Sequence, residues 1–182
     1  MMEYKHLILG LSFVLIGVSE AYSTEMHPSH EVHVHGQAVL NIVLDGSTLF
    51  IEFESPAINL IGFEHAPVNE EQKSKLQNAK QTLAATEQLF YFSTATCRSE
   101  NVEIEVPYTN QHEDRKLPHR GEHVDFHASY TFKCEPVKDL QEITIKLFSL
   151  FPAIRQIKTY WISHGIQAAT VLESSNPILK IN

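Results

Sequence analysis

The chain has 182 residues and a formal net charge of −8 at pH 7, and 43% of its residues are hydrophobic. An acidic chain repels nucleic acid and anionic lipid, which argues against a nucleic-acid-binding or membrane-surface protein. The hydrophobic content is enough for one well-packed core, so a single domain is expected.

The first 21 residues have the pattern of a secretory signal peptide. A short segment with Lys5 is followed by an apolar block over 7–18 and a small-x-small site that ends at Ala21. The block is shorter than the roughly 20 residues of a membrane-spanning helix. A lipid anchor would need a cysteine at the cleavage site, whereas the first cysteine of the chain is Cys97. We therefore expect cleavage after Ala21 and a periplasmic domain over 22–182 without a membrane anchor.

Local patterns predict a hairpin and one main helix in this domain. Alternating apolar residues on both sides of Asp45-Gly46 predict a β-hairpin with its turn there. The segment 55–67 mixes turn-forming and apolar residues and is expected to be an ordered loop. Asn69 then precedes apolar residues at near-helical spacing, which predicts an amphipathic helix from about Glu70 to Leu89.

The second half of the domain alternates in the manner of β-strands. Five further strands are predicted, at about 102–106, 124–134, 143–147, 157–162 and 166–172. Between the first two lies a polar, histidine-containing loop at about 109–123. In the strand 124–134 the apolar residues share one face, and Asp125 and His127 lie on the other. These elements predict an α+β fold, with an antiparallel sheet and one main amphipathic helix.

Cys97 and Cys134 are the only cysteines of the chain. Export to an oxidising compartment favours a disulfide between them. The loop that this bridge closes has 38 residues, for which chain entropy predicts about 4 kcal/mol of stabilisation. With both thiols oxidised, any metal must be held by nitrogen and oxygen atoms.

Ten of the eleven histidines follow residue 21, and eight of these form two clusters. Zinc is bound by imidazole nitrogen and carboxylate oxygen, so both clusters are candidate zinc sites. The zinc-protease, serine-hydrolase and phosphate-loop motifs are all absent from the sequence. We therefore expect a metal-binding protein and no enzyme activity.

The first cluster centres on His33 and His35, just before the first predicted strand. Residues two apart in an extended chain point the same way and lie about 6.6 Å apart, so two imidazoles can meet one ion. His30 adds a third ligand if the chain bends there. The alternative is an exposed histidine-rich terminus that meets metal only incidentally.

The second cluster contains His112, His119, His123 and His127. In one straight strand His123 and His127 would lie about 13 Å apart, so a shared ion requires a curved chain at His123. Asp125 and His127 have the same spacing as the first pair. Basic residues in this segment make a solvated polar loop the alternative, and the sequence leaves open which histidines share an ion.

Several runs of the chain resemble the ZrgA-like periplasmic zinc-uptake proteins. They are His33-Val34-His35-Gly36, Glu54-Ser55-Pro56-Ala57, Gly62-Phe63-Glu64-His65-Ala66-Pro67, Phe126-His127-Ala128-Ser129-Tyr130 and Cys134. The similarity covers about His30 to Leu172, and the run 62–67 is its most specific part. The resemblance implies zinc binding in the periplasm and service to a zinc import system.

By position, the resemblance points to four histidines as ligands. They are His33, His35, His65 beside Glu64, and His127. A lone histidine such as His65 is otherwise expected to be a packed residue. The loop departs from the family, whose members often carry dense His-Asp or His-Glu repeats there, so we expect its histidines to be auxiliary.

The sequence therefore predicts a monomeric periplasmic zinc-binding protein that serves zinc uptake, with an envelope zinc transporter as its partner. The alternative is a zinc-stabilised adaptor that contacts a transporter without carrying metal. The candidate ligands are His30, His33, His35, His65, His112, His119, His123 and His127. Imidazole also binds copper, nickel and cobalt, so the sequence does not fix the selectivity for zinc.

Overall fold

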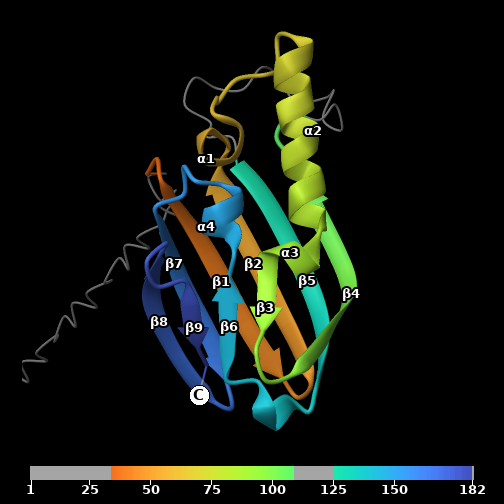
Figure 1. Ribbon diagram of the computed structural model, residues 1–182, viewed down its shortest axis with the longest axis vertical. Helices are drawn as coiled ribbons and strands as arrows, with labels where there is room; N and C mark the ends of the chain where they lie inside the picture. Colours follow the sequence, from red (N-terminus) through yellow and green to blue (C-terminus); the bar gives the residue numbers. More distant parts are fainter. Residues whose placement is uncertain (1–33, 109–124, 182) are drawn as a thin grey trace, which may run out of the picture. The chain divides into compact units, whose positions relative to one another are not determined.

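The computed structural model describes residues 34–108 and 125–181 (Figure 1). These residues fall in one unit of the chain, Val32–Asn182. The predicted signal peptide and the predicted histidine loop lie outside the described residues.

The larger of two sheets has six strands. They are β1 (Gln37–Asp45), β2 (Thr48–Pro56), β4 (Thr96–Glu105), β5 (Asp125–Glu135), β7 (Gln156–Ser163) and β8 (Ile166–Glu173). Their order across the sheet is β4-β5-β2-β1-β7-β8. β1 and β2 form the predicted hairpin, whose last pair is Asp45 with Thr48. Gly46 in its turn has a φ of 55°, a conformation that glycine adopts without strain.

One pair of neighbours in this sheet is parallel. β1 pairs with β7 from Gln37 opposite Gln156 to Leu44 opposite Ser163, whereas the other neighbours are antiparallel. The sheet is therefore mixed, and the prediction of an antiparallel sheet was wrong in this respect. Parallel strands need a long crossover, here supplied by the whole chain between β1 and β7.

A second sheet of three strands packs on one face of the first. It consists of β3 (Phe90–Phe92), β6 (Glu142–Ile145) and β9 (Ile178–Lys180), in the order β3-β6-β9. The Phe90 ring lies 5.2 Å from that of Tyr130 on β5, and the Phe92 ring lies 5.3 Å from that of Phe132. Figure 1 shows the small sheet in front of the large one.

The core lies between the two sheets and is built from alternate residues of their strands. In β5, Phe126, Ala128, Tyr130 and Phe132 are buried, as the alternation predicted. The Tyr130 hydroxyl donates a hydrogen bond of 3.0 Å to the Leu83 carbonyl, and burial raises the pKa of Tyr130. The opposite side chains of the strands point away from the core.

The main helix, α2 (Glu70–Ala84), begins where the sequence predicted and ends earlier. The Asn69 side chain accepts a hydrogen bond of 2.9 Å from the Gln72 backbone N–H, so it caps the helix. Ala85 leaves the helical conformation, and a short helix α3 (Thr86–Leu89) follows. None of the helices in residues 34–108 and 125–181 is long and apolar enough to cross a membrane.

Cys97 of β4 and Cys134 of β5 form the predicted disulfide. The two residues are direct partners in the register of these strands. The bridge therefore joins strand β4 to its neighbour β5 in the sheet.

Replacing Cys97 and Cys134 by alanine should lower the free energy of unfolding by about 2–4 kcal/mol, because the unfolded chain is no longer restricted by a closed loop. Urea unfolding followed by circular dichroism measures the change. Ser99→Ala, an exposed position on β4, serves as the control and should change the value by less than about 0.5 kcal/mol. Equal unfolding midpoints for the wild type and the cysteine variant would contradict the prediction.

Candidate metal centre

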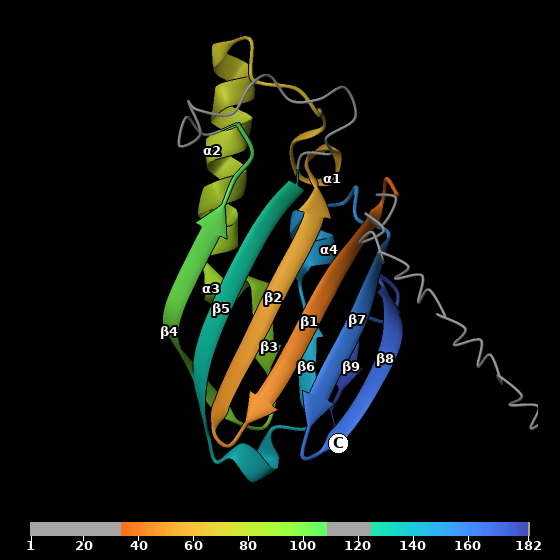
Figure 2. The ribbon, with the colours of Figure 1, turned by 180° about the vertical axis from the view of Figure 1, so that it is seen from behind.

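Three potential metal ligands meet on the outer face of the large sheet, the face that the small sheet does not cover. Glu54 of β2 is the direct partner of His127 of β5, and Pro56 is the partner of Asp125. Glu54, Asp125 and His127 all point away from the core, because they alternate with buried residues. Figure 2 shows that β2 ends and β5 begins at the same end of the sheet.

The geometry of these three side chains fits a zinc ion. Their potential ligand atoms all lie within 4.8 Å of one another, and His127 Nδ1 is 3.8 Å from Glu54 Oε2. Ligand atoms around a tetrahedral zinc ion at about 2.1 Å are themselves about 3.4 Å apart, so small side-chain rotations would complete the coordination. One imidazole and two carboxylates are ligands that zinc accepts in proteins, and we call Glu54, Asp125 and His127 the triad.

The surroundings of the triad are acidic. A shallow depression of about 240 Å³ includes Glu54 and His127 in its lining. Three more glutamates line it, Glu52, Glu103 and Glu105, and Glu105 is the partner of His127 on β4. Their combined negative potential raises the local concentration of cations.

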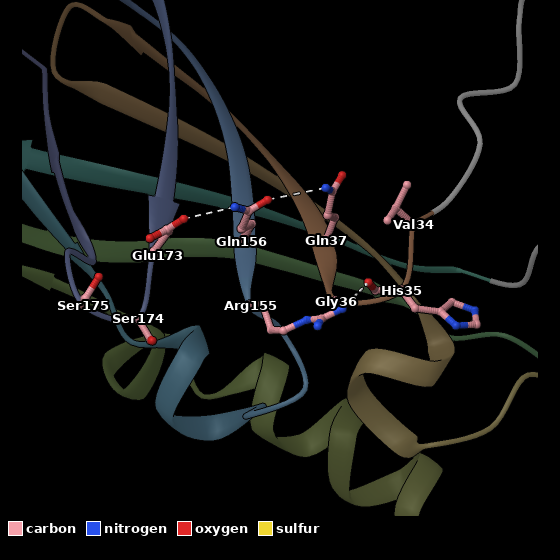
Figure 3. A pocket seen from close by; sticks show the side chains of 9 residues that line it. All are labelled: Val34, His35, Gly36, Gln37, Arg155, Gln156, Glu173, Ser174 and Ser175. Atoms are coloured by element: carbon pink, nitrogen blue, oxygen red, sulfur yellow. Dashed lines mark hydrogen bonds between the residues drawn. The ribbon is translucent and has the colours of Figure 1, made fainter.

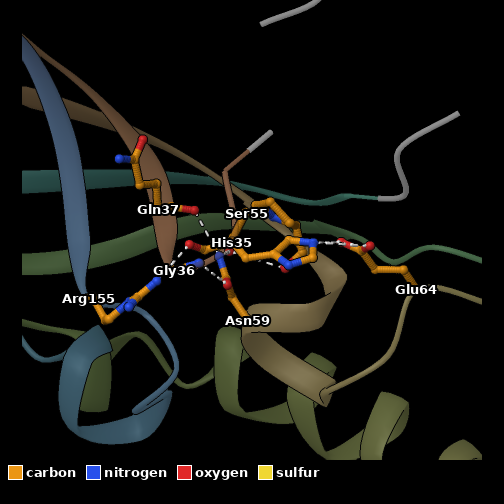
Figure 4. A network of polar contacts seen from close by, with 8 residues as sticks. His35, Gly36, Gln37, Ser55, Asn59, Glu64 and Arg155 are labelled. Carbon is orange, nitrogen blue, oxygen red and sulfur yellow. Dashed lines mark hydrogen bonds and ion pairs between the residues drawn. The ribbon is translucent and has the colours of Figure 1, made fainter. Parts of the chain in front are cut away.

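A second pair of donors is formed by His35, just before β1, and Glu64, which follows β2 in the chain. His35 Nε2 is 3.3 Å from Glu64 Oε2 and 3.3 Å from Glu64 Oε1 (Figure 4). β1 begins at the end of the sheet where β2 ends, because the two strands are antiparallel. The pair His35–Glu64 therefore belongs to the same end of the sheet as the triad.

Buried Asn59 fixes the backbone beside His35. It lies in α1 (Ala57–Ile61), a short helix within the segment predicted to be a loop, and is only 4% exposed. Its Oδ1 accepts a hydrogen bond of 2.7 Å from the Gly36 N–H, and its Nδ2 donates to the Gln37 carbonyl at 2.8 Å and to Ser55 Oγ at 3.1 Å (Figure 4). The His35 ring is thus exposed on a backbone that is held in place.

Arg155 holds the same backbone from the other side. The backbone N–H groups of Arg155 and Gln156 donate to the Gly36 carbonyl at 2.8 and 3.0 Å, and the Arg155 guanidinium donates to the His35 carbonyl at 3.2 Å. Gly36 has a φ of 84°, and a Cβ at this residue would lie 2.5 Å from Arg155 Nε. The positive φ therefore favours glycine here, and a side chain at this residue would also displace the Arg155 guanidinium.

A cavity of about 440 Å³ opens beside this backbone (Figure 3). Polar side chains line it in a row, in which Gln37 donates to Gln156 at 3.4 Å and Gln156 donates to Glu173 at 3.0 Å. The His35 ring points away from this row in Figure 3. His35 itself lines the cavity, which therefore borders one donor of the candidate metal centre.

Tyr108 connects the two groups of donors. Burial, together with the negative charges of Glu64 and Asp125, raises the pKa of Tyr108 to about 12. One carboxylate from each group of donors, Glu64 and Asp125, therefore acts on the same phenol. The phenol keeps its proton at neutral pH, and its buried oxygen forms no hydrogen bond within the described part of the chain.

A family model described as ZrgA family zinc uptake protein matches residues 32–181. The chain belongs to the ZrgA family. This finding confirms the resemblance seen in the sequence and supports a zinc-related role for the protein. A comparison with curated proteins gives no match.

The structure describes three of the eight histidines predicted as ligands in this ZrgA family member. His127 belongs to the triad, and His35 contacts Glu64. His65 is exposed; its ring stacks on Phe63 with 5.1 Å between centroids, and its Nδ1 lies 3.0 Å from the Ala66 carbonyl oxygen. The others, His30, His33, His112, His119 and His123, lie outside the described residues.

Sequence reasoning did not identify Glu54 as a ligand candidate. Its position opposite His127 depends on the register between β2 and β5, two strands that are far apart in the sequence. Asp125 was within reach of the sequence, because strand alternation already placed it on the same face as His127.

Asn59→Ala should lower the free energy of unfolding by about 1–3 kcal/mol, because it leaves the Gly36 N–H and the Gln37 carbonyl without their partner. Urea unfolding measures this change. The matched control is Asn101→Ala, since the exposed Asn101 side chain contacts the Glu103 carboxylate at 2.9 Å on the surface of β4. If both variants unfold at the same urea concentration, Asn59 does not hold the backbone of His35.

Proposed function

We propose that this ZrgA family member binds zinc through Glu54, Asp125 and His127 and holds the ion for transfer to an envelope zinc transporter, without catalysing a reaction. The observation that carries the proposal is the convergence of these three side chains within 4.8 Å in a zinc uptake family. The neighbouring His35–Glu64 pair supplies further donors as the ion enters or leaves.

The exposure of the triad supports a carrier rather than a zinc-stabilised adaptor. Structural zinc sites are closed by four protein ligands, whereas an open site keeps a position free. The side chains of His127 and Glu54 are 51% and 43% exposed, respectively, and the triad supplies three ligands. Solvent and a receiving ligand can therefore reach the ion, which a carrier requires for release.

The disulfide and the family indicate an extracytoplasmic protein. Disulfides persist in oxidising compartments such as the periplasm. We place the protein in the periplasm, as the predicted signal peptide implies, and infer that it acts there as a monomer. The loop histidines His112, His119 and His123 would serve as auxiliary sites that capture zinc.

His127→Ala should weaken zinc binding by more than about 100-fold, because loss of an outer-shell partner alone costs 10–100-fold at metal sites. Competition with a chelator at fixed pH measures the affinity. His164→Ala is the matched control, since His164 lies in the turn between β7 and β8 and should keep wild-type affinity. Wild-type affinity in His127→Ala would rule out the triad as the primary site.

Removal of zinc should leave the fold intact, because the core lies between the sheets and the triad lies on the outer face. Far-ultraviolet circular dichroism in excess chelator should match that of the zinc-loaded protein. Without chelator, added zinc should raise the unfolding midpoint only as far as mass action predicts from the measured zinc affinity. Cooperative unfolding on chelation would favour the zinc-stabilised adaptor instead.

A further inference from the structure

The outer face of the large sheet, which carries the candidate metal centre, also carries an apolar patch. Val43 of β1 is the direct partner of Phe50 on β2 and of Ile162 on β7. Tyr160 precedes Ile162 by two residues on the same face, and Val171 lies on β8 opposite Lys158. We call the five residues Val43, Phe50, Tyr160, Ile162 and Val171 the apolar patch.

These five side chains are unusual for a solvated sheet face. Strands with one solvated face normally place polar residues there, and contiguous exposed apolar groups mark interaction surfaces. The exposed fraction of these five residues is 37–53%, and they are half of the ten exposed large hydrophobic residues in the described part of the chain. Figure 2 shows no described helix or strand over this face.

The other side of the same face is acidic. Glu52 is the partner of Asn41 on β1, which in turn is the partner of Tyr160 on β7. The acidic side and the apolar patch therefore lie in one continuous surface. The acidic side consists of Glu52, Glu54, Glu103 and Glu105 around His127.

We propose that this face is the docking surface for a partner protein that presents an apolar area flanked by lysine or arginine residues. Positive charges complement the glutamates, and an apolar area would remove the patch from water. A second copy of this chain carries the same glutamates and a net charge of −8, so it lacks this complementarity. The consequence of docking for zinc rests on the proposed function, since Glu54 and His127 belong both to the triad and to the docking surface.

Docking at this face determines where the ion goes. A partner seated on the apolar patch and the acidic side lies over Glu54 and His127, so a released ion enters the partner rather than bulk solvent. Lysine or arginine residues beside the glutamates also reduce the negative potential that holds the cation. Docking and release are thereby linked.

The test removes the patch and leaves the triad in place. Tyr160→Ser with Ile162→Ser is compared with Tyr91→Ser with Ile178→Ser, which removes one tyrosine and one isoleucine of similar exposure from the small sheet. Each variant replaces the wild type in cells that lack their own copy of the gene, and growth is measured in zinc-depleted medium. A benzophenone photocrosslinker at Val171 or, as the control, at Val68 reports the contact in the same cells.

The patch variant should keep zinc affinity within about 2-fold and the wild-type circular dichroism spectrum, while its zinc-limited growth falls to that of the deletion strain. The control variant should grow like wild type, and crosslinks should form at Val171 but not at Val68. Wild-type growth of the patch variant, or equal loss in the control, would overturn the proposal. Should Tyr160→Ser with Ile162→Ser alter the spectrum, Phe50→Ser replaces it in the same comparison.

Sedimentation and zinc titration separate the remaining outcomes. Concentration-dependent dimers that disappear in the patch variant would show that a second copy occupies the face, which overturns the proposal. A wild-type protein that does not bind zinc would instead refute the proposed function, whereas the crosslink at Val171 would still report on the docking surface. The two failures are therefore distinguishable.

Discussion

The register between β2 and β5 is the constraint on which the candidate metal centre depends. Glu54 faces His127 only because Phe53 and Phe126, their neighbours in the chain, are both directed into the core. A shift of one residue in either strand would turn an apolar side chain to water and a charged one into the core. Core packing, rather than attraction between the ligands, therefore holds the glutamate and the histidine together.

The candidate centre combines a rigid backbone with accessible side chains. Asn59 holds the chain at Gly36 through a buried hydrogen bond and Arg155 holds it through a backbone hydrogen bond, while the His35 side chain is 63% exposed. Ordering the backbone in advance lowers the entropic cost of bringing ligands to an ion. In the proposed function, exposed side chains also allow that ion to leave again.

Local patterns in the sequence predicted the elements that are determined by residues close to one another in the chain. The hairpin at Asp45-Gly46, the start of α2 at Asn69 and the two faces of β5 all follow from neighbouring residues, and the structure confirms them. The Cys97–Cys134 disulfide was also predictable, because the chain offers no other pairing.

Features that depend on distant segments were not predictable in this way. The short strands β3 and β9 have no clear alternation, and the parallel pairing of β1 with β7 leaves no local signal. Glu54 belongs to the triad only through a partner strand far away in the sequence. Asn59 was overlooked because its role depends on the position of Gly36 rather than on its own surroundings.

The pairing of β1 with β7 also sets the order in which a newly made chain can become functional. Gln37 and Gln156, which pair across these strands, are 119 residues apart, so one edge of β1 has no partner until most of the polypeptide has been synthesised. The Gly36 carbonyl likewise waits for the N–H groups of Arg155 and Gln156. An incomplete chain lacks the support for His35, so a truncated product would not hold that histidine in place.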